Sequence, residues 1–269
     1  MAESREAVAH AAVTNGKHHR QNPSDGAATG AGAPGLIVHR SGAQLRLVTQ
    51  PDHAAFAADV LALLRLPELV AHPRRAALLR AVRLHDNGWR ELDAAPPIDR
   101  ESGEPYDFRA LPGPLRLEVW QRGTDRYVAD DPYVALLAHQ HALALHAGRE
   151  DDAGWSDLLP RLAERRDELR DRCGLDDGQL QRDYGFLDLA DTLSLAVCAG
   201  WEEPFERHGL RGQLAGDELR LAPFPLAGAT TFRVSCRHVP ARRWGGDAEL
   251  AGELAEQRWG TFAVRLVPG

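Results

Sequence analysis

Lysine and closely spaced cysteines are nearly missing from this chain of 269 residues. Lys17 is the only lysine, and it lies in an amino-terminal segment without apolar periodicity, which argues against a lysine Schiff base or a lysine general base. The three cysteines, Cys173, Cys198 and Cys236, form no CxxC pair and cannot all pair with one another. We therefore predict reduced thiols in a cytoplasmic protein rather than a disulfide framework.

Long apolar runs and an excess of positive charge are also missing. No run approaches the roughly 20 residues that cross a bilayer, so no membrane-spanning helix is expected. The amino terminus lacks the apolar stretch of a secretory signal, so nothing argues for export. With a formal net charge of −7, the chain lacks the global basic field that nucleic-acid binding requires. A small-molecule substrate is predicted, with no nucleic acid and no membrane as partner, while the oligomeric state stays open.

The chain is predicted to divide into a disordered leader, residues 1–34, and one folded domain, residues 35–269. The leader ends in "NPSDGAATGAGAPG", which is rich in Gly, Ala and Ser and has no apolar period. Two β-type runs then flank Ser41 and Gly42, a pattern that indicates a hairpin. The last quarter of the chain again predicts strands, as in "ATTFRVSCRHVP".

Between these ends the apolar residues recur with the helical period of 3.6. The first of these helices is predicted to begin after Pro51, with Asp52 as its N-cap. A segment rich in Pro and Gly, residues 87–114, interrupts the helices and predicts a long loop, which in a compact domain is more often functional than not. We expect an α+β fold with a mainly helical core, against which strands from the amino-terminal hairpin and the carboxy-terminal segment pack.

Ionisable residues occupy positions on these predicted helices where an apolar side chain is expected. Residues three and four apart share one face of a helix. His53 and the adjacent pair His85–Asp86 fall on the apolar stripes of two helices, and Asp188 and Asp191 share the apolar face of a third. On a fourth helix, two histidines two residues apart occupy opposite stripes, namely His139 and His141.

Taken singly, each of these residues has an ordinary structural explanation, since a buried His usually has a hydrogen-bond partner and a buried Asp often caps a helix. Burying a carboxylate nevertheless costs several kcal/mol unless it is paired or bound to a metal. Asp86 and Asp191 would also repel each other, and a divalent cation between them removes that repulsion. Imidazole and carboxylate ligands together suit Mn, Fe, Zn or Co better than Ca or Mg. The pattern therefore predicts one or two divalent transition-metal ions.

The order His53, His85–Asp86 and Asp191 resembles the HD-domain superfamily of metal-dependent phosphohydrolases. The resemblance implies an HD-like helical core, a metal ion held by these four residues, and hydrolysis of a small phosphate ester. His141 stands where many members place a further His, so the resemblance implies a metal ligand or a phosphate contact there.

Asp188, one helical turn before Asp191, is then a catalytic candidate. It is either the base that accepts a proton from water, a residue that supports a ligand, or simply the partner of a nearby arginine. The arginines around the motif are numerous, and none stands out as a phosphate clamp. Trp89, Glu91 and Asp93, which open the long loop, are candidates for the mouth of a pocket, although Trp89 also suits a core position.

Several strings resemble more closely the bacterial family called domain of unknown function 3891. They are "LVTQPDHAAFA", "HDNGWRELDAAPPIDRESGEPYDF", "LLAHQHALAL" and "DLADTLSLAVC", and the resemblance covers residues 36–267. The HDxGW string followed by DAAPPID is specific to this family, which implies an architecture and candidate ligands but no reaction. The chain departs from the family at His139, where many members have Ser, so His139 is a further candidate ligand unless it faces solvent.

Two other functions stay open. Some HD-type proteins hold two irons in such a cage and use dioxygen to oxidise small molecules, and the additional histidines His139 and His141 allow that chemistry here. Alternatively, the domain is a non-catalytic module that binds a metal or another ligand. The sequence does not decide between hydrolysis and oxidation, nor does it identify the metal.

Overall fold

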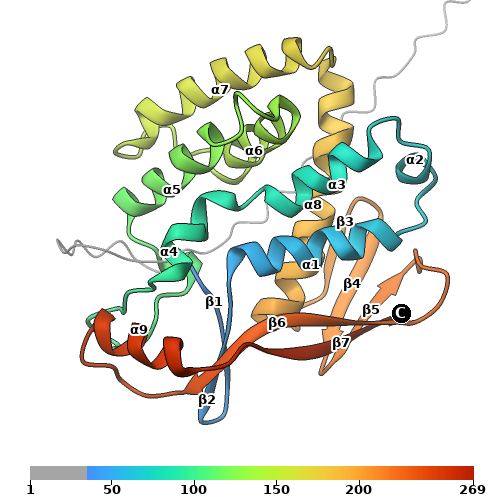
Figure 1. The fold of residues 1–269 in the computed structure, drawn as a ribbon. Helices are drawn as coiled ribbons and strands as arrows, with labels where there is room; N and C mark the ends of the chain where they lie inside the picture. Colours follow the sequence, from blue (N-terminus) through green and yellow to red (C-terminus); the bar gives the residue numbers. More distant parts are fainter. Residues whose placement is uncertain (1–34) are drawn as a thin grey trace, which may run out of the picture. The chain divides into compact units, whose positions relative to one another are not determined.

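The computed structural model describes residues 35–269, which lie in one compact unit. The leader predicted for residues 1–34 lies outside the described residues. Strands stand near both ends of the described chain, and helices fill its middle (Figure 1). In this part of the chain the helices are α1 (Gln50–Leu63), α2 (Pro67–Val70), α3 (Arg75–Leu84), α4 (Arg90–Ala94), α5 (Gly113–Asp125), α6 (Pro132–Leu145), α7 (Trp155–Arg172), α8 (Asp177–Ala199) and α9 (Asp247–Glu256), with 3-10 turns η1 (Asn87–Trp89) and η2 (Phe108–Ala110).

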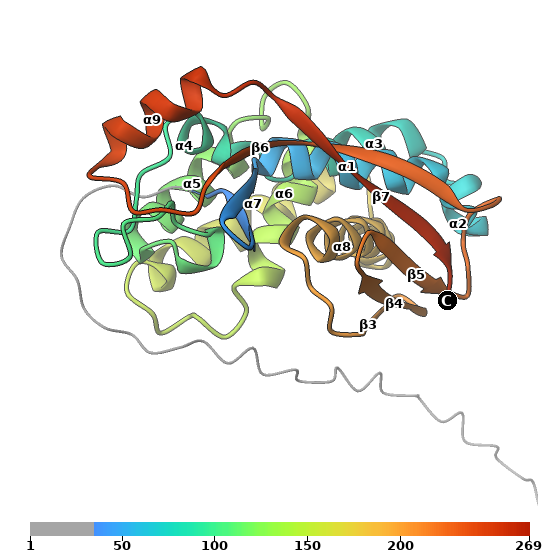
Figure 2. The ribbon, with the colours of Figure 1, turned by 90° about the horizontal axis from the view of Figure 1, so that it is seen from below.

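The strands of residues 35–269 form one mixed, seven-stranded sheet with the order β1-β2-β6-β7-β5-β4-β3. Neighbouring strands are antiparallel except β5 and β7, which are parallel. Figure 2 shows this sheet curving around α8. The strands are β1 (Ile37–Ser41), β2 (Gln44–Val48), β3 (Phe205–Arg207), β4 (Leu210–Ala215), β5 (Glu218–Ala222), β6 (Thr230–Pro240) and β7 (Gly260–Pro268).

This sheet corrects the fold predicted from the sequence. The chain is α+β, and the hairpin around Ser41 and Gly42 is confirmed as β1–β2. The prediction of a mainly helical, HD-like core with strands packed on it from both ends is wrong. Strand β2 pairs with β6, with Arg46 opposite His238, so the two ends of the chain build a single continuous sheet. A pairing between strands so distant in the sequence leaves no local pattern from which to predict it.

Capping residues fix where α1 begins and where α8 begins and ends. The Thr49 hydroxyl accepts the backbone N–H of Asp52 at 3.1 Å and starts α1. Asp52, the predicted N-cap, is instead an acidic residue of the first turn. Helix α8 starts with a capping box of Asp176 and Gln179 and ends at Gly200, whose φ is +70°. These caps set which side chains of α1 and α8 face inward.

The main hydrophobic core holds α1, α3, α6 and α8 against the sheet. Leu78 of α3, Leu137 of α6 and Leu187 of α8 are fully buried in it. Burying one such side chain contributes about 2 kcal/mol, so this packing fixes the four helices relative to one another. No helix among residues 35–269 has the length and apolar character needed to cross a membrane.

Candidate metal centre

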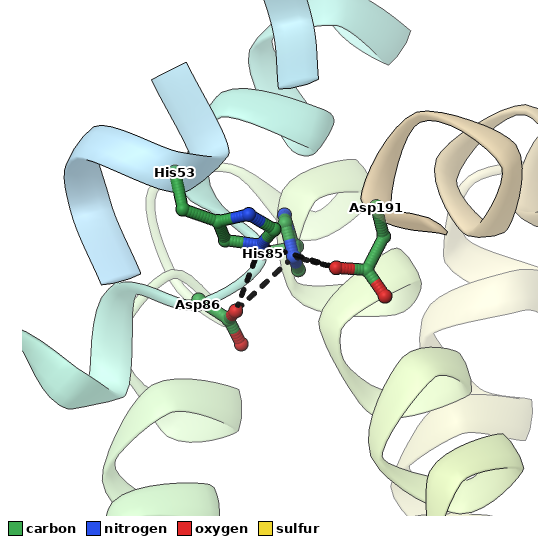
Figure 3. A group of neighbouring side chains, drawn as sticks. All are labelled: His53, His85, Asp86 and Asp191. Atoms are coloured by element: carbon green, nitrogen blue, oxygen red, sulfur yellow. Dashed lines mark ion pairs between the residues drawn. The ribbon is translucent and has the colours of Figure 1, made fainter. Parts of the chain in front are cut away.

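Four ionisable side chains from three helices of the core meet at one buried point (Figure 3). His53 comes from α1, His85 and Asp86 from the end of α3, and Asp191 from α8. One ligand atom of each residue lies within 4.8 Å of the corresponding atoms of the other three, and all four residues are buried. The structure thus brings together the four residues that the sequence singled out as metal ligands. We call them the metal cage.

Imidazole nitrogens and carboxylate oxygens alternate around this point. His53 Nε2 lies 3.1 Å from Asp191 Oδ1 and 3.6 Å from Asp86 Oδ2. His85 Nε2 lies 3.2 Å from Asp86 Oδ2 and 3.5 Å from Asp191 Oδ1. Ligands bound tetrahedrally at about 2.0–2.1 Å from an ion stand roughly 3.3–3.4 Å apart. The four separations therefore match the edges of a coordination shell.

His85 and Asp86, which directly follow α3, reach the same point because the backbone leaves the helical conformation between them. His85 keeps helical backbone angles, whereas Asp86, with φ −102° and ψ 27°, leaves the helical region and begins a turn. The side-chain amide of Asn87 fixes this turn by donating to the carbonyl oxygens of Leu84 (2.9 Å) and Gly123 (3.1 Å). The end of the helix therefore opens enough to aim both ligands inward.

Gly88 lets this turn pack directly on α5. A Cβ at Gly88 would stand 2.2 Å from the carbonyl oxygen of Val119 and 2.9 Å from the Cα of Gly123, so only glycine fits. The segment 87–114, predicted as a long loop, thus begins with the ordered elements η1 and α4. Its first residues position the metal cage rather than close over it.

Hydrogen bonds on the far side of each imidazole direct its Nε2 lone pair toward the centre. His85 Nδ1 donates to the carbonyl oxygen of Val82 at 2.7 Å. Ser194 Oγ donates its single proton to the carbonyl oxygen of Asp191 at 3.0 Å, so it accepts from His53 Nδ1 at 2.7 Å. Both Nε2 atoms are buried without a hydrogen bond of ordinary geometry. Buried acceptors facing carboxylates are unfavourable unless a cation lies between them.

The electrostatics of the cage also favour a cation. Burial by itself raises the pKa of Asp191, but His53 and His85 hold that pKa well below its ordinary value. Burial likewise raises the pKa of Asp86, but the interaction with His85 outweighs burial, and the pKa lies below its ordinary value. Burial lowers the pKa of His85, yet Asp86 and Asp191 raise it well above its ordinary value. The carboxylates stay ionised and attract a positive charge, whether that is a proton on imidazole or a metal ion.

The donor set fits a divalent transition-metal ion. Two imidazole nitrogens and two carboxylate oxygens suit Mn, Fe, Co or Zn, and the two carboxylates balance the charge of a divalent ion. The orphaned Nε2 atoms are then explained as ligands. This buried cluster of His and Asp side chains is therefore able to hold a metal ion.

His141 and His139, two residues apart on α6, face different parts of the molecule. The ring of His141 meets that of His85 edge-on at 4.9 Å, and its Nδ1 is buried without a hydrogen-bond partner. His141 thus stands next to the metal cage but outside the group of four. His139 lines a separate cleft of about 320 Å³ between α5 and α7, with Gln121 and Leu158 among its walls. Of the two histidines, only His141 is placed to act at the cage.

Asp188 lies one helical turn before Asp191 on α8 and already has partners. Its Oδ2 lies 3.0 Å from His208 Nε2 and 3.7 Å from Arg207 Nε. The arginine partner that the sequence analysis offered as an alternative to a catalytic base is therefore present in the structure.

The three loop residues suggested for the mouth of a pocket have structural partners. Trp89 is buried and packs against Gly35. Glu91 pairs with Arg126 at 2.5 Å. Asp93 is buried and accepts the backbone N–H of Gln50 at 2.7 Å, at the first turn of α1. These contacts give Trp89, Glu91 and one oxygen of Asp93 structural partners, whereas Asp93 Oδ1 is buried without a hydrogen-bond partner.

Three residues that contact His53 or Asp188 were not predicted from the sequence. Ser194 follows Asp191 by three positions, and this spacing on a buried stripe was an available signal for a residue that orients His53. Arg207 and His208 gave no local signal, because they stand at the β3–β4 turn and reach α8 only through the fold.

A family model described as "Protein of unknown function (DUF3891)" matches residues 36–241, which is more than half of the chain. The family identified from the HDxGW string is therefore confirmed. Neither the curated proteins nor the solved structures include a match to this chain.

Proposed function

We propose that this chain, which belongs to the DUF3891 family, is a metal-dependent hydrolase that acts on a small phosphate ester. One observation carries the proposal. Two buried imidazoles, His53 and His85, point unpaired Nε2 atoms at two buried carboxylates across 3.1 to 3.6 Å.

An ion-pair network without a metal explains this arrangement less well. A protonated imidazole would place its N–H on a line to one carboxylate oxygen at about 2.7–2.9 Å. Instead, His85 Nε2 lies 3.2 Å from one oxygen and 3.5 Å from another, and its hydrogen-bond geometry satisfies neither. A nitrogen placed between two carboxylate oxygens, with no short bond to either, is what ligands around a common ion show.

Each residue of the cage has a definite part in the proposed reaction. When bound, a divalent ion activates water and stabilises negative charge on a phosphoryl oxygen. His53 and His85 contribute neutral nitrogen ligands, held in the required tautomer by their Nδ1 hydrogen bonds. Asp86 and Asp191 contribute the charge that keeps the ion in place. The order of these ligands along the chain, which resembles HD-domain phosphohydrolases, favours a phosphate ester as substrate.

His141 is the candidate for direct action on substrate or water. Its Nδ1 has no hydrogen-bond partner, and its ring stands 4.9 Å from that of His85. Burial lowers the pKa of His141, which leaves the ring neutral near pH 7 with a lone pair on one nitrogen. A neutral ring there is equally able to bind a second ion.

That second possibility supports an alternative function. A third imidazole beside the cage, that of His141, favours a centre with two metal ions, and a pair of irons would suit oxidation of a small molecule by dioxygen. Two irons per chain, together with substrate-dependent oxygen uptake, would identify this chemistry. One ion of Mn, Co or Zn per chain fits hydrolysis.

An anaerobic screen separates these functions. The protein is loaded in turn with Mn, Co, Zn and Fe and offered phosphomonoesters and phosphodiesters, and phosphate release or ester cleavage is measured. Asp86→Asn should abolish turnover because it removes a charged ligand. Asp183→Asn is the matched control, since Asp183 is also buried and paired with a histidine but lies outside the cage. The proposal fails if no metal supports ester cleavage. Substrate-dependent oxygen uptake by the iron form would instead support oxidation by a pair of irons.

A further inference from the structure

The tip of the β3–β4 hairpin carries a residue that the turn itself does not favour. Arg207 pairs with Leu210, which leaves His208 and Gly209 as a two-residue turn. Their φ values are +49° and +76°, as in a type I′ turn, for which Asn-Gly and Gly-Gly are preferred. Among residues 35–269, His208 is the only residue other than glycine with a positive φ. A histidine in this backbone conformation is strained, and such strain concentrates at functional sites.

Helix α8 is shaped to receive this histidine. Asp188 Oδ2 lies 3.0 Å from His208 Nε2 and 3.7 Å from Arg207 Nε. Gly185, one turn earlier, leaves room for the ring, because a Cβ there would stand 3.0 Å from His208 Cε1. Glycine inside a helix is itself unfavourable. His208 in the turn and Gly185 in the helix are each unfavourable locally, and both allow the contact between His208 and Asp188.

The contact lies on the face of α8 that leads out from the metal cage. Asp188 and Asp191 are three residues apart and share that face. Side-chain exposure rises from the cage toward the hairpin, from 0% at His53 of α1 and 8% at Asp191 of α8 to 20% at Asp188 of α8 and 43% at His208 of the turn. The hairpin side of the site is therefore more exposed to solvent than the centre of the cage. A molecule that reaches the cage along this face passes the turn.

The charges near the cage also favour the hairpin as the place where an anion binds. Two carboxylates and a divalent ion sum to zero, so the cage offers a phosphate anion no excess positive charge. Arg122 and Arg126, which bind the η1 turn behind the cage, are both paired with Glu91. Arg207 and His208 together face a single carboxylate, Asp188. Arg207 keeps guanidinium N–H groups for a second anion, and the doubly protonated form of His208 keeps its Nδ1–H.

We propose that Arg207 and His208 form the anion-recognition element of the substrate site and donate hydrogen bonds to the phosphate group of the substrate. Asp188 acts as the positioning residue that holds both side chains. This inference rests on the proposed function for its substrate class. The sequence alone did not single out an arginine that contacts phosphate, and this inference assigns that contact to Arg207. It also gives Asp188 a role other than that of a base.

Binding of inorganic phosphate to the manganese-loaded protein, measured by titration calorimetry, tests the inference without requiring turnover. Arg207→Gln removes one donor, and the phosphate Kd should rise about tenfold, as expected for a hydrogen bond to a charged group. Arg220→Gln is the matched control, because Arg220 is a similarly exposed arginine on β5 of the same sheet, and its partner is Glu218. Its Kd should equal that of the wild type, and the metal content of every variant should be unchanged.

His208→Asn separates a role in binding from a role in folding. It converts the turn to Asn-Gly, the preferred type I′ sequence, so the melting temperature should not fall. Phosphate affinity should nevertheless drop, again by about tenfold. Weaker binding by a variant as stable as the wild type cannot be attributed to unfolding.

Two results would overturn the inference: wild-type phosphate affinity in both Arg207→Gln and His208→Asn, or no phosphate binding by the metal-loaded wild type. Failure of the proposed hydrolysis has a different signature. In that case phosphate binds and both variants weaken it, yet no ester is cleaved with any metal. The anion site would then stand, and only the catalytic assignment would fall.

Discussion

Helix α8 contributes an aspartate to two buried clusters of similar composition, and only the metal cage leaves imidazole nitrogens unpaired at its centre. In the other cluster Asp183 accepts from His72 Nε2 at 2.7 Å and from the Tyr133 hydroxyl at 2.6 Å. His72 Nδ1 in turn accepts the backbone N–H of Arg74 at 3.1 Å, so the ring carries its proton on Nε2. Each of these donors has an acceptor. The cluster is a closed structural network.

In the metal cage the imidazole protons sit on the opposite nitrogens. His53 and His85 donate from Nδ1, so their Nε2 lone pairs face the carboxylates of Asp86 and Asp191. The same residue types therefore make a sealed network in one place and a set of ligands in the other. What distinguishes a metal site from a structural ion pair is the position of the imidazole proton, which the outer hydrogen bonds determine.

Stabilisation by metal should separate the two clusters most strongly. Excess Mn²⁺ added to chelator-treated protein should raise the free energy of unfolding by about 4 kcal/mol at a thousandfold excess over Kd, because the ion binds only the folded cage. Asp86→Asn should remove this gain, and Asp183→Asn should keep it. Thermal melts with and without Mn²⁺ measure both. Equal stabilisation of the two variants would erase the distinction between the clusters.

The closed network should show the opposite sensitivity. Asp183→Asn should lower the stability of the metal-free protein by about 3 kcal/mol, because it removes the charged acceptor of the buried hydrogen bonds from His72 and Tyr133. Metal affinity should not change. Urea unfolding without metal and metal titration of the folded variant provide the two numbers. A loss of metal binding with intact stability would mean that Asp183 belongs to the cage.

Another buried histidine, His146, provides a pH test. Burial lowers the pKa of His146, whose ring stacks on Trp155 at 3.8 Å, to about 3. As the pH falls below about 6.5, His146 becomes protonated in the unfolded chain but stays neutral in the folded chain. The stability that neutral His146 contributes is therefore complete above pH 6.5 and is lost as the pH falls toward 3. At pH 5 the loss is about 2 kcal/mol.

His146→Phe keeps the stacking and removes the titration. The difference in stability between wild type and variant, measured by urea unfolding from pH 7 to pH 4.5, should shift in favour of the variant as the pH falls. A difference that does not change with pH would contradict the depressed pKa of His146.

The smallest effect concerns the residue that sets the tautomer of His53. Ser194→Ala removes the acceptor of His53 Nδ1, and metal affinity should fall about tenfold. Thr124→Val is the control, because the Thr124 hydroxyl also bonds a carbonyl of its own helix but contacts no ligand. Competition titration with a chelating dye measures both affinities. Unchanged affinity in Ser194→Ala would show that the outer hydrogen bond does not position His53.

The ligands of the cage were predictable because each one breaks a local rule. His53, His85 and Asp191 stand on apolar stripes of helices, and helical periodicity is a short-range property that the sequence displays directly. Pro and Gly in the segment 87–114 suggested a loop, yet Gly88 is there for close packing on α5. Composition alone does not distinguish these two uses of glycine.

The sheet and the hairpin contact were not predictable for the opposite reason. The pairing of β2 with β6 and the parallel pairing of β5 with β7 join segments that are distant or cross over in the sequence. His208 meets Asp188 only because β3 and β4 fold back along α8. A single sequence contains no period that reports such long-range contacts.

The metal content of protein purified without chelator tests the central claim most directly. Elemental analysis of the wild type, Asp183→Asn and Asp86→Asn should give about one divalent transition-metal ion per chain, or two if His141 binds a second, in the first two proteins. Asp86→Asn should contain almost none, because the remaining three ligands carry too little charge. Folded wild-type protein without metal after growth in metal-supplemented medium would contradict the account, as would an Asp86→Asn variant that retains as much metal as the wild type.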